Sequence, residues 1–143
     1  MELEGRVWKS KQQWLVEVPS LDIMTQGESY EEALEMIKDA LIELVRCYFP
    51  TKAGKDFDVK VHDYKKGVIG ITTTDNKLLL ALSLRRQREK SQTTIREASE
   101  RLGAKSPNAY AQYEKGKIRI SLEQYEKLLH AANPFQHTLL RVI

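Results

Sequence analysis

Residues Thr94–Gly116 read TIREASERLGAKSPNAYAQYEKG, and this stretch decides the fold of the second half of the chain. It opens with Thr94 and Glu97 at the spacing of a capping box, in which each side chain accepts a hydrogen bond from the other residue's backbone N–H. Glycine in Leu102-Gly103 can adopt the left-handed conformation that ends a helix. Ser106-Pro107 then offers an N-cap and a proline at the tolerated first helical position. The stretch therefore predicts two short helices joined across a turn, a helix-turn-helix.

Two further helices are expected to flank this pair. The first is expected from about residue 78 to 89, with leucines at its start and arginines at its end. The last begins at Ser121, where Gln124 completes a second capping-box spacing, and its apolar residues follow a one-sided helical pattern up to Ala132. Pro134 closes it. The second half is therefore expected to be an all-α domain.

The helix expected over residues 107–115 divides into two faces. Tyr110 and Tyr113 are three residues apart and are assigned to the core, whereas Asn108, Ala109 and Gln112 lie on another face. Amide side chains can bond the adenine N6/N7 pair, and an alanine methyl can meet a thymine methyl, so these three are the expected base-reading residues. Composition alone leaves it equally open that the two amides are ordinary solvated residues.

Hydroxyl-bearing and basic side chains surround this helix, where a DNA backbone would pass. The expected phosphate-binding residues are Thr94, Arg96, Lys105, Ser106, Lys115 and Lys117, and Arg119 follows them.

The string from Arg88 to Gly116 resembles the phage-repressor-like (XRE/Cro-type) helix-turn-helix family, most specifically in Leu102-Gly103 and in the closing Tyr-Glu-Lys-Gly. Three features depart from the family pattern. Ile95 stands where glutamine is common, Ser99 stands where alanine is preferred, and the turn is about one residue longer than usual. The resemblance implies binding of double-stranded DNA, with the third helix in a major groove.

Charge divides the chain near residue 75. Residues 1–75 carry 10 Lys+Arg against 14 Asp+Glu, whereas residues 76–143 carry 13 against 6. An acidic and a basic half indicate modules with different partners, a polyanion being the natural partner of the basic one. We therefore predict two domains, residues 1–74 and 75–143.

The acidic half has the pattern of a small α+β domain. Strands are expected at residues 6–9, 14–18, 22–26, 56–62 and 67–73. Between the third and fourth lies an amphipathic helix over residues 30–48, opened by Ser29 and Glu32 at capping-box spacing. Its apolar stripe comprises Tyr30, Ala33, Leu34, Ile37, Ala40, Leu41, Leu44, Val45 and Tyr48. The predicted fold class is α+β, a small antiparallel sheet with one long helix followed by the all-α domain.

The segment WLVEVP at residues 14–19, followed by TQGESYEEA at residues 25–33, resembles the HicB antitoxin family. The resemblance implies a partial RNase H-like fold that neutralises a small basic HicA-type mRNA-cleaving toxin, while the C-terminal domain represses the operon as a homodimer or higher oligomer. Asp22, Gln26, Glu28 and Glu31, beside this string, are the expected toxin contacts. The alternative is a stand-alone transcriptional repressor whose first domain serves oligomerisation or ligand sensing.

Enzymatic chemistry finds little support in the sequence. The three histidines are scattered without ligand spacing, and no serine or cysteine stands near a plausible base. We expect no catalytic residue, metal or cofactor; a divergent metal-dependent nuclease using Asp22 or Glu17 is the remaining rival.

Cys47, the single cysteine, excludes an intrachain disulfide and is expected in the core. No signal-peptide or membrane-spanning pattern occurs, so a cytoplasmic location without membrane partners is expected.

Overall fold

The computed structural model describes residues 1–136 and 140–141. The chain forms two compact units, one of residues Met1–Asp75 with the C-terminal end and one of Asn76–Thr138. The sequence assigns all of residues 75–143 to the second domain. In the structure, however, β6 (Leu140–Arg141) pairs antiparallel with β1 (Glu2–Ser10), which returns the end of the chain to the first unit. Because β1 and β6 lie at opposite ends of the chain, no short sequence pattern predicts that they pair.

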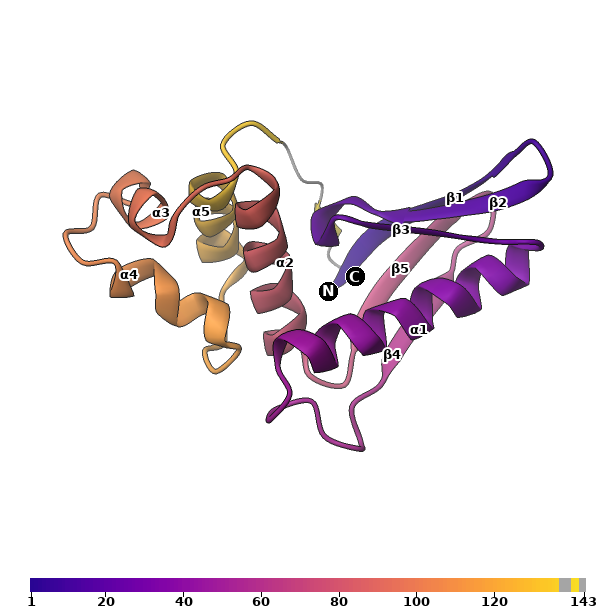
Figure 1. The fold of residues 1–143 in the computed structure, drawn as a ribbon, viewed down its shortest axis with the longest axis horizontal. Helices are drawn as coiled ribbons and strands as arrows, with labels where there is room; N and C mark the ends of the chain where they lie inside the picture. The colour runs from indigo at the N-terminus through magenta and orange to yellow at the C-terminus, as the bar shows by residue number, and fades with distance from the viewer. Residues whose placement is uncertain (137–139, 142–143) are drawn as a thin grey trace. The chain divides into compact units, whose positions relative to one another are not determined.

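The first unit is an antiparallel sheet with one long helix, which confirms the predicted α+β class (Figure 1). Its elements are β1, β2 (Gln13–Val18), the 3-10 turn η1 (Pro19–Leu21), β3 (Ile23–Gly27), α1 (Tyr30–Tyr48), β4 (Val59–Asp63) and β5 (Val68–Thr73). Neighbouring strands follow the order β3-β2-β1-β5-β4, so β3 and β4 form the two edges. The strands lie near the predicted positions, although β4 begins three residues late and Asp22 caps η1 in a left-handed conformation.

Helix α1 packs along one face of this sheet (Figure 1). The Ser29 hydroxyl accepts from the Glu32 backbone N–H at 3.0 Å, which gives one half of the predicted capping box. The core lies between buried α1 side chains and alternate strand residues. Its fully buried side chains include Leu3, Val16, Val18, Leu21, Ile37, Leu41, Val45, Ile69 and Ile71.

The predicted one-sided stripe of α1 is present: Ala33, Ile37, Leu41 and Val45 are buried and the other five stripe residues are half-buried. One expectation for α1 is wrong. Cys47 is exposed, since it lies two positions beyond Val45 and therefore on another side of the helix.

The second unit is all-α. It contains α2 (Asn76–Lys90), α3 (Ile95–Arg101), α4 (Asn108–Ala111), the 3-10 segment η2 (Gln112–Lys115) and α5 (Leu122–Ala132). The expected helix over residues 107–115 is thus one α-helical turn followed by one tighter turn, and it begins one residue after Pro107. The core of this unit is formed by Leu78, Leu79, Leu82, Leu84, Ala98, Tyr110, Tyr125 and Leu128.

Candidate nucleic-acid interface

Helix α3 begins at the predicted capping box. The Thr94 hydroxyl accepts from the Glu97 N–H at 3.1 Å, and the Glu97 carboxylate accepts from the Thr94 N–H at 3.2 Å. The hydrogen bond from the Thr94 backbone N–H, followed by one from the Thr94 side chain, holds the pKa of the Glu97 carboxyl below its ordinary value. The Thr94 hydroxyl is thus engaged with the Glu97 carboxylate, and a phosphate contact would require its hydrogen to turn away from that carboxylate.

The turn between α3 and α4 is fixed by side chain to backbone hydrogen bonds. Gly103 has φ +76°, the left-handed conformation expected after Leu102. The Ser106 hydroxyl accepts from the Asn108 N–H at 3.3 Å, so Ser106 supports the helix start although α4 begins two residues later. The buried Ser99 hydroxyl donates to the Pro107 carbonyl at 2.9 Å. A serine at this position therefore ties the longer turn to α3, which alanine could not do.

A charged pair anchors the recognition segment, α4 with η2, to α2. The Arg88 guanidinium donates from Nε and Nη2 to the two carboxylate oxygens of Glu114 at 2.7 and 3.0 Å, and from Nη1 to the Thr93 carbonyl at 3.1 Å. Hydrogen bonding to Glu114 raises the pKa of Arg88 above its ordinary value. The Glu114 side chain is only 8% exposed, so the pair is largely shielded from water. Neither residue was singled out as an anchor from the sequence, because the two lie 26 positions apart and no local pattern shows the pairing.

The two tyrosines of the recognition segment differ in burial. Tyr110 is fully buried, as predicted, and burial raises the pKa of its phenol. Tyr113 is only half-buried, so its assignment to the core is partly wrong, and its hydroxyl accepts from the Gln124 amide at 2.6 Å. The Ser121 hydroxyl still caps α5 by accepting from the Gln124 N–H at 3.2 Å. The amide of Gln124 therefore joins α5 to the recognition segment.

These anchors leave the predicted reading face in solvent. Asn108 and Gln112 are exposed and lie four residues apart, while Ala109 between them is half-exposed. The Gln112 amide makes only a 3.5 Å contact with the Ala109 carbonyl, at the limit of a hydrogen bond, so it can turn to a base edge. The arrangement can present two amides and one methyl group to a groove.

The predicted phosphate-binding side chains are all exposed and fall into three groups. Thr94 and Arg96 lie at the start of α3, and Lys105 and Ser106 lie in the turn. Lys115, Lys117 and Arg119 lie at and beyond the end of η2. Hydroxyl and basic groups thus lie at both ends of the reading face, where the two DNA backbones that border a DNA groove would pass.

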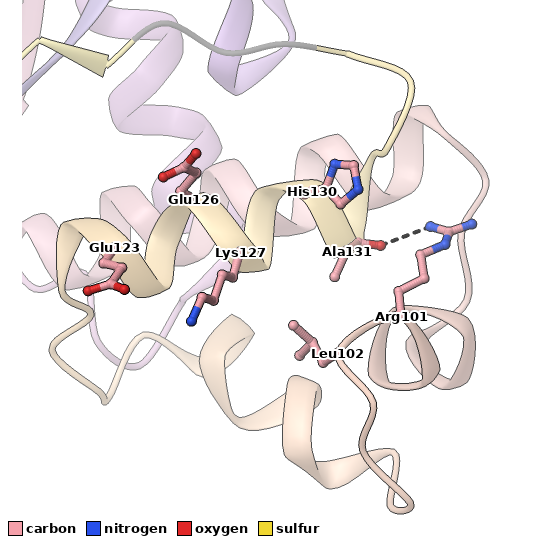
Figure 2. A pocket seen from close by; sticks show the side chains of 7 residues that line it. All are labelled: Arg101, Leu102, Glu123, Glu126, Lys127, His130 and Ala131. Atoms are coloured by element: carbon pink, nitrogen blue, oxygen red, sulfur yellow. Dashed lines mark hydrogen bonds between the residues drawn. The ribbon is translucent and has the colours of Figure 1, made fainter.

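A cleft of about 460 Å³ lies elsewhere on this unit, between the end of α3 and α5 (Figure 2). Its lining residues are Arg101, Leu102, Glu123, Glu126, Lys127, His130 and Ala131. Figure 2 shows the guanidinium of Arg101 reaching the Ala131 carbonyl, at 2.8 Å, and the same side chain bonds the Thr93 hydroxyl at 3.0 Å. This cation therefore joins α3 to α5, and the cleft is separate from the reading face.

In the first unit, the expected toxin contacts do not converge on one point. Gln26, Glu28 and Glu31 are exposed where β3 passes into α1, whereas Asp22 lies at the other end of β3, about 13 Å from Gln26 at strand spacing. Residues 1–136 and 140–141 contain no group of three His, Cys, Asp or Glu side chains able to hold a metal ion. No helix within the described residues is long and apolar enough to cross a membrane.

The comparison with known proteins found a family match only in the second unit. Residues 84–133, about a third of the chain, match the family described as Helix-turn-helix. No curated protein matches the chain. The second unit is therefore a helix-turn-helix domain, the kind found in DNA-binding transcription regulators, and no enzyme family is indicated.

Proposed function

We propose that the chain is an antitoxin that represses its own operon. Its second unit binds operator DNA with Asn108, Ala109 and Gln112 in a major groove, and its first unit neutralises a basic HicA-type mRNA-cleaving toxin. The observation that carries the DNA-binding part is the reading face, held by buried anchors between exposed basic side chains. One such helix reads only a few base pairs, so two copies on a palindromic operator are expected.

The surface of α1 supports a basic partner for the first unit. Glu31, Glu35, Asp39 and Glu43 are exposed and follow at four-residue spacing along the helix. Like charges at this spacing destabilise a helix by about 0.2–0.5 kcal/mol for each pair. A toxin that binds RNA is expected to be basic, so its docking would neutralise this stripe and gain association rate. The element order of this unit, three strands, one long helix and two strands, is the one predicted from its sequence.

The DNA-binding part is tested by fluorescence anisotropy with a labelled duplex from the chain's own promoter region. Gln112→Ala should weaken binding to this duplex by about 1–3 kcal/mol while leaving binding to a scrambled duplex unchanged. Gln12→Ala, an exposed amide in the β1–β2 hairpin of the first unit, is the matched control. An equal loss on both duplexes would show that Gln112 does not read bases.

The antitoxin part is tested by co-expression with the product of the neighbouring gene, which the proposal requires to be a short basic protein. A stable complex and rescue of growth by the chain are expected, and replacing Glu31 and Glu35 with lysine should weaken both. Repression without a co-purified partner would instead identify a stand-alone repressor, the alternative in which the first unit serves oligomerisation or ligand sensing.

A further inference from the structure

Basic side chains gather at one end of the sheet in the first unit, although this part of the chain is acidic overall. Residues 1–75 carry 10 Lys+Arg, and five of these, all exposed, lie on β1, in the β1–β2 hairpin or in the β4–β5 turn: Arg6, Lys9, Lys11, Lys65 and Lys66. The two turns lie at the same end, because the Gly67 carbonyl accepts from the Val7 N–H at 2.9 Å and so holds the β4–β5 turn beside β1. A cationic end on an acidic unit indicates an anionic partner.

The backbone at these turns sets three of the lysines apart. Lys11, Lys65 and Lys66 have φ of +58°, +70° and +55°, the left-handed region that side chains other than Asn and Asp rarely adopt. Glycine or asparagine would fit these turn positions with less strain. The Lys65 ammonium pairs with Asp63 at 3.5 Å, but Lys11 and Lys66 meet no carboxylate in the part of the chain that the structure describes. Strained backbone of this kind gathers at binding sites, so these lysines fit a role toward a partner better than a role in the fold.

An exposed tryptophan lies beside the two turns. Trp8 is 38% exposed and stands opposite Leu15, on the sheet face away from α1, since the buried Val7 next to it points into the core. From Trp8 to Ser10, β1 pairs with β2 alone among the described residues, so its other edge is open beside the β4–β5 turn. The indole face is therefore accessible next to the cationic side chains.

We propose that this end of the first unit binds single-stranded nucleic acid, with a base stacked on Trp8 and backbone phosphates at Lys11 and Lys66. Proteins that bind single strands combine a cationic path for the phosphates with aromatic side chains on which bases stack. A duplex keeps its bases stacked inside and would leave Trp8 without a partner. Glu28 and Glu31 put negative charge on the helix side of this end, so the strand follows the turns and the open face of the sheet.

The test measures quenching of tryptophan fluorescence in the full chain by single-stranded oligonucleotides. Both tryptophans lie in the first unit, so the signal does not follow the helix-turn-helix. RNA and DNA of one mixed sequence, each about 12 nucleotides long, distinguish the two sources of a single strand. Saturable quenching that weakens with salt is expected for at least one of them. By anisotropy, Trp8→Ala should weaken binding about fivefold or more, whereas Trp8→Tyr keeps an aromatic face and should retain it.

A double glycine variant separates binding from folding. Glycine suits the left-handed backbone, so Lys11→Gly with Lys66→Gly should melt at or above the temperature of the natural chain. The slope of log K against log salt should nevertheless fall by about 1.4, since each phosphate contact with a single strand contributes about 0.7. Lys55→Ala with Lys60→Thr removes two exposed lysines away from the two turns. This matched control should bind as the natural chain does.

Three results would overturn the inference: no quenching by either oligonucleotide, an equal loss of affinity in the control, or a loss in the double glycine variant that is confined to duplex DNA. Binding of the promoter duplex should be unchanged in that variant, because the second unit carries it. A failure here therefore leaves the DNA-binding proposal standing. Loss of operator binding in Gln112→Ala would likewise leave the single-strand site untouched.

Discussion

Removing the carboxylate of Glu114 should destabilise the second unit more than any surface substitution. Glu114→Ala leaves the Arg88 guanidinium without the two charge-assisted bonds of 2.7 and 3.0 Å. Breaking a buried ion pair by deleting one partner costs about 3–5 kcal/mol, because the remaining charge is left uncompensated. The Arg88 side chain is 17% exposed, so water can partly solvate the remaining charge and the lower end of this energy range applies. We expect a loss of about 3 kcal/mol in the free energy of unfolding.

Two optical signals follow the two units separately in a urea titration, so the first unit serves as the control for the second. Both tryptophans, Trp8 and Trp14, lie in the first unit, so tryptophan fluorescence in a urea titration follows that unit. Circular dichroism at 222 nm also follows the helices of the second unit. Glu114→Ala should move the circular dichroism transition to lower urea and leave the fluorescence transition in place. In heating, about 3 kcal/mol corresponds to a fall in Tm of about 12–24 °C for a unit of this size.

A double-mutant cycle then tests the cause of the loss. Replacing both partners, Arg88→Met with Glu114→Leu, removes the stranded charge and should lie within about 2 kcal/mol of the natural chain. Glu89→Ala, which breaks the exposed Arg85–Glu89 pair of 3.2 Å on the same helix, should cost under about 0.5 kcal/mol. The assigned role of the pair would be refuted if Glu114→Ala lowered the free energy of unfolding by less than about 1 kcal/mol. It would also be refuted if the losses of the two single variants simply added up in the double variant.

Three further outcomes are expected. Lys117→Ala should weaken binding to specific and scrambled duplexes alike and reduce the slope of log K against log salt by about 1; an unchanged slope would mean that this lysine contacts no phosphate. The pKa of the Glu97 carboxyl is lowered by the capping box, so its stabilisation of the folded state is complete above its unfolded-state pKa and is lost as pH falls through the folded value. An NMR titration should find that pKa below the ordinary range, and Thr94→Ala should raise it; no change would contradict the hydrogen-bonded box. Gly27→Ala should cost about 1–3 kcal/mol, because a Cβ there would lie 2.5 Å from a backbone nitrogen of α1. Gly54→Ala meets nothing within 4 Å and should leave stability within about 1 kcal/mol of the natural chain, so an equal cost at both positions would exclude crowding as the cause.

Predictions from the sequence succeeded where the signal is local. The capping box of Thr94 and Glu97, the left-handed Gly103 and the buried Tyr110 all lie within a few residues of the features that predict them. The helix-turn-helix and the exposed state of Asn108 and Gln112 followed from the same short-range rules. Helical spacing fixes which side chains share a face, so the candidate reading face could be proposed before any coordinates were known.

Errors arose where a residue's neighbours come from distant parts of the chain. Cys47 was assigned to the core, but which side of α1 is covered depends on the sheet, and the helix pattern does not contain that information. Tyr113 shares a helix face with Tyr110, yet it meets the amide of Gln124 near the surface. The pairing of β6 with β1 joins opposite ends of the chain.

By itself, therefore, the sequence determined the helices, five of the six strands, the turn and the side chains that could read DNA, because caps, glycines and apolar periodicity act within a few residues. Only the tertiary structure decided what holds that reading face in place. The Arg88–Glu114 pair and the Ser99 bond to Pro107 depend on which segments become neighbours. Packing makes that choice over the whole chain, so no short stretch of sequence records it.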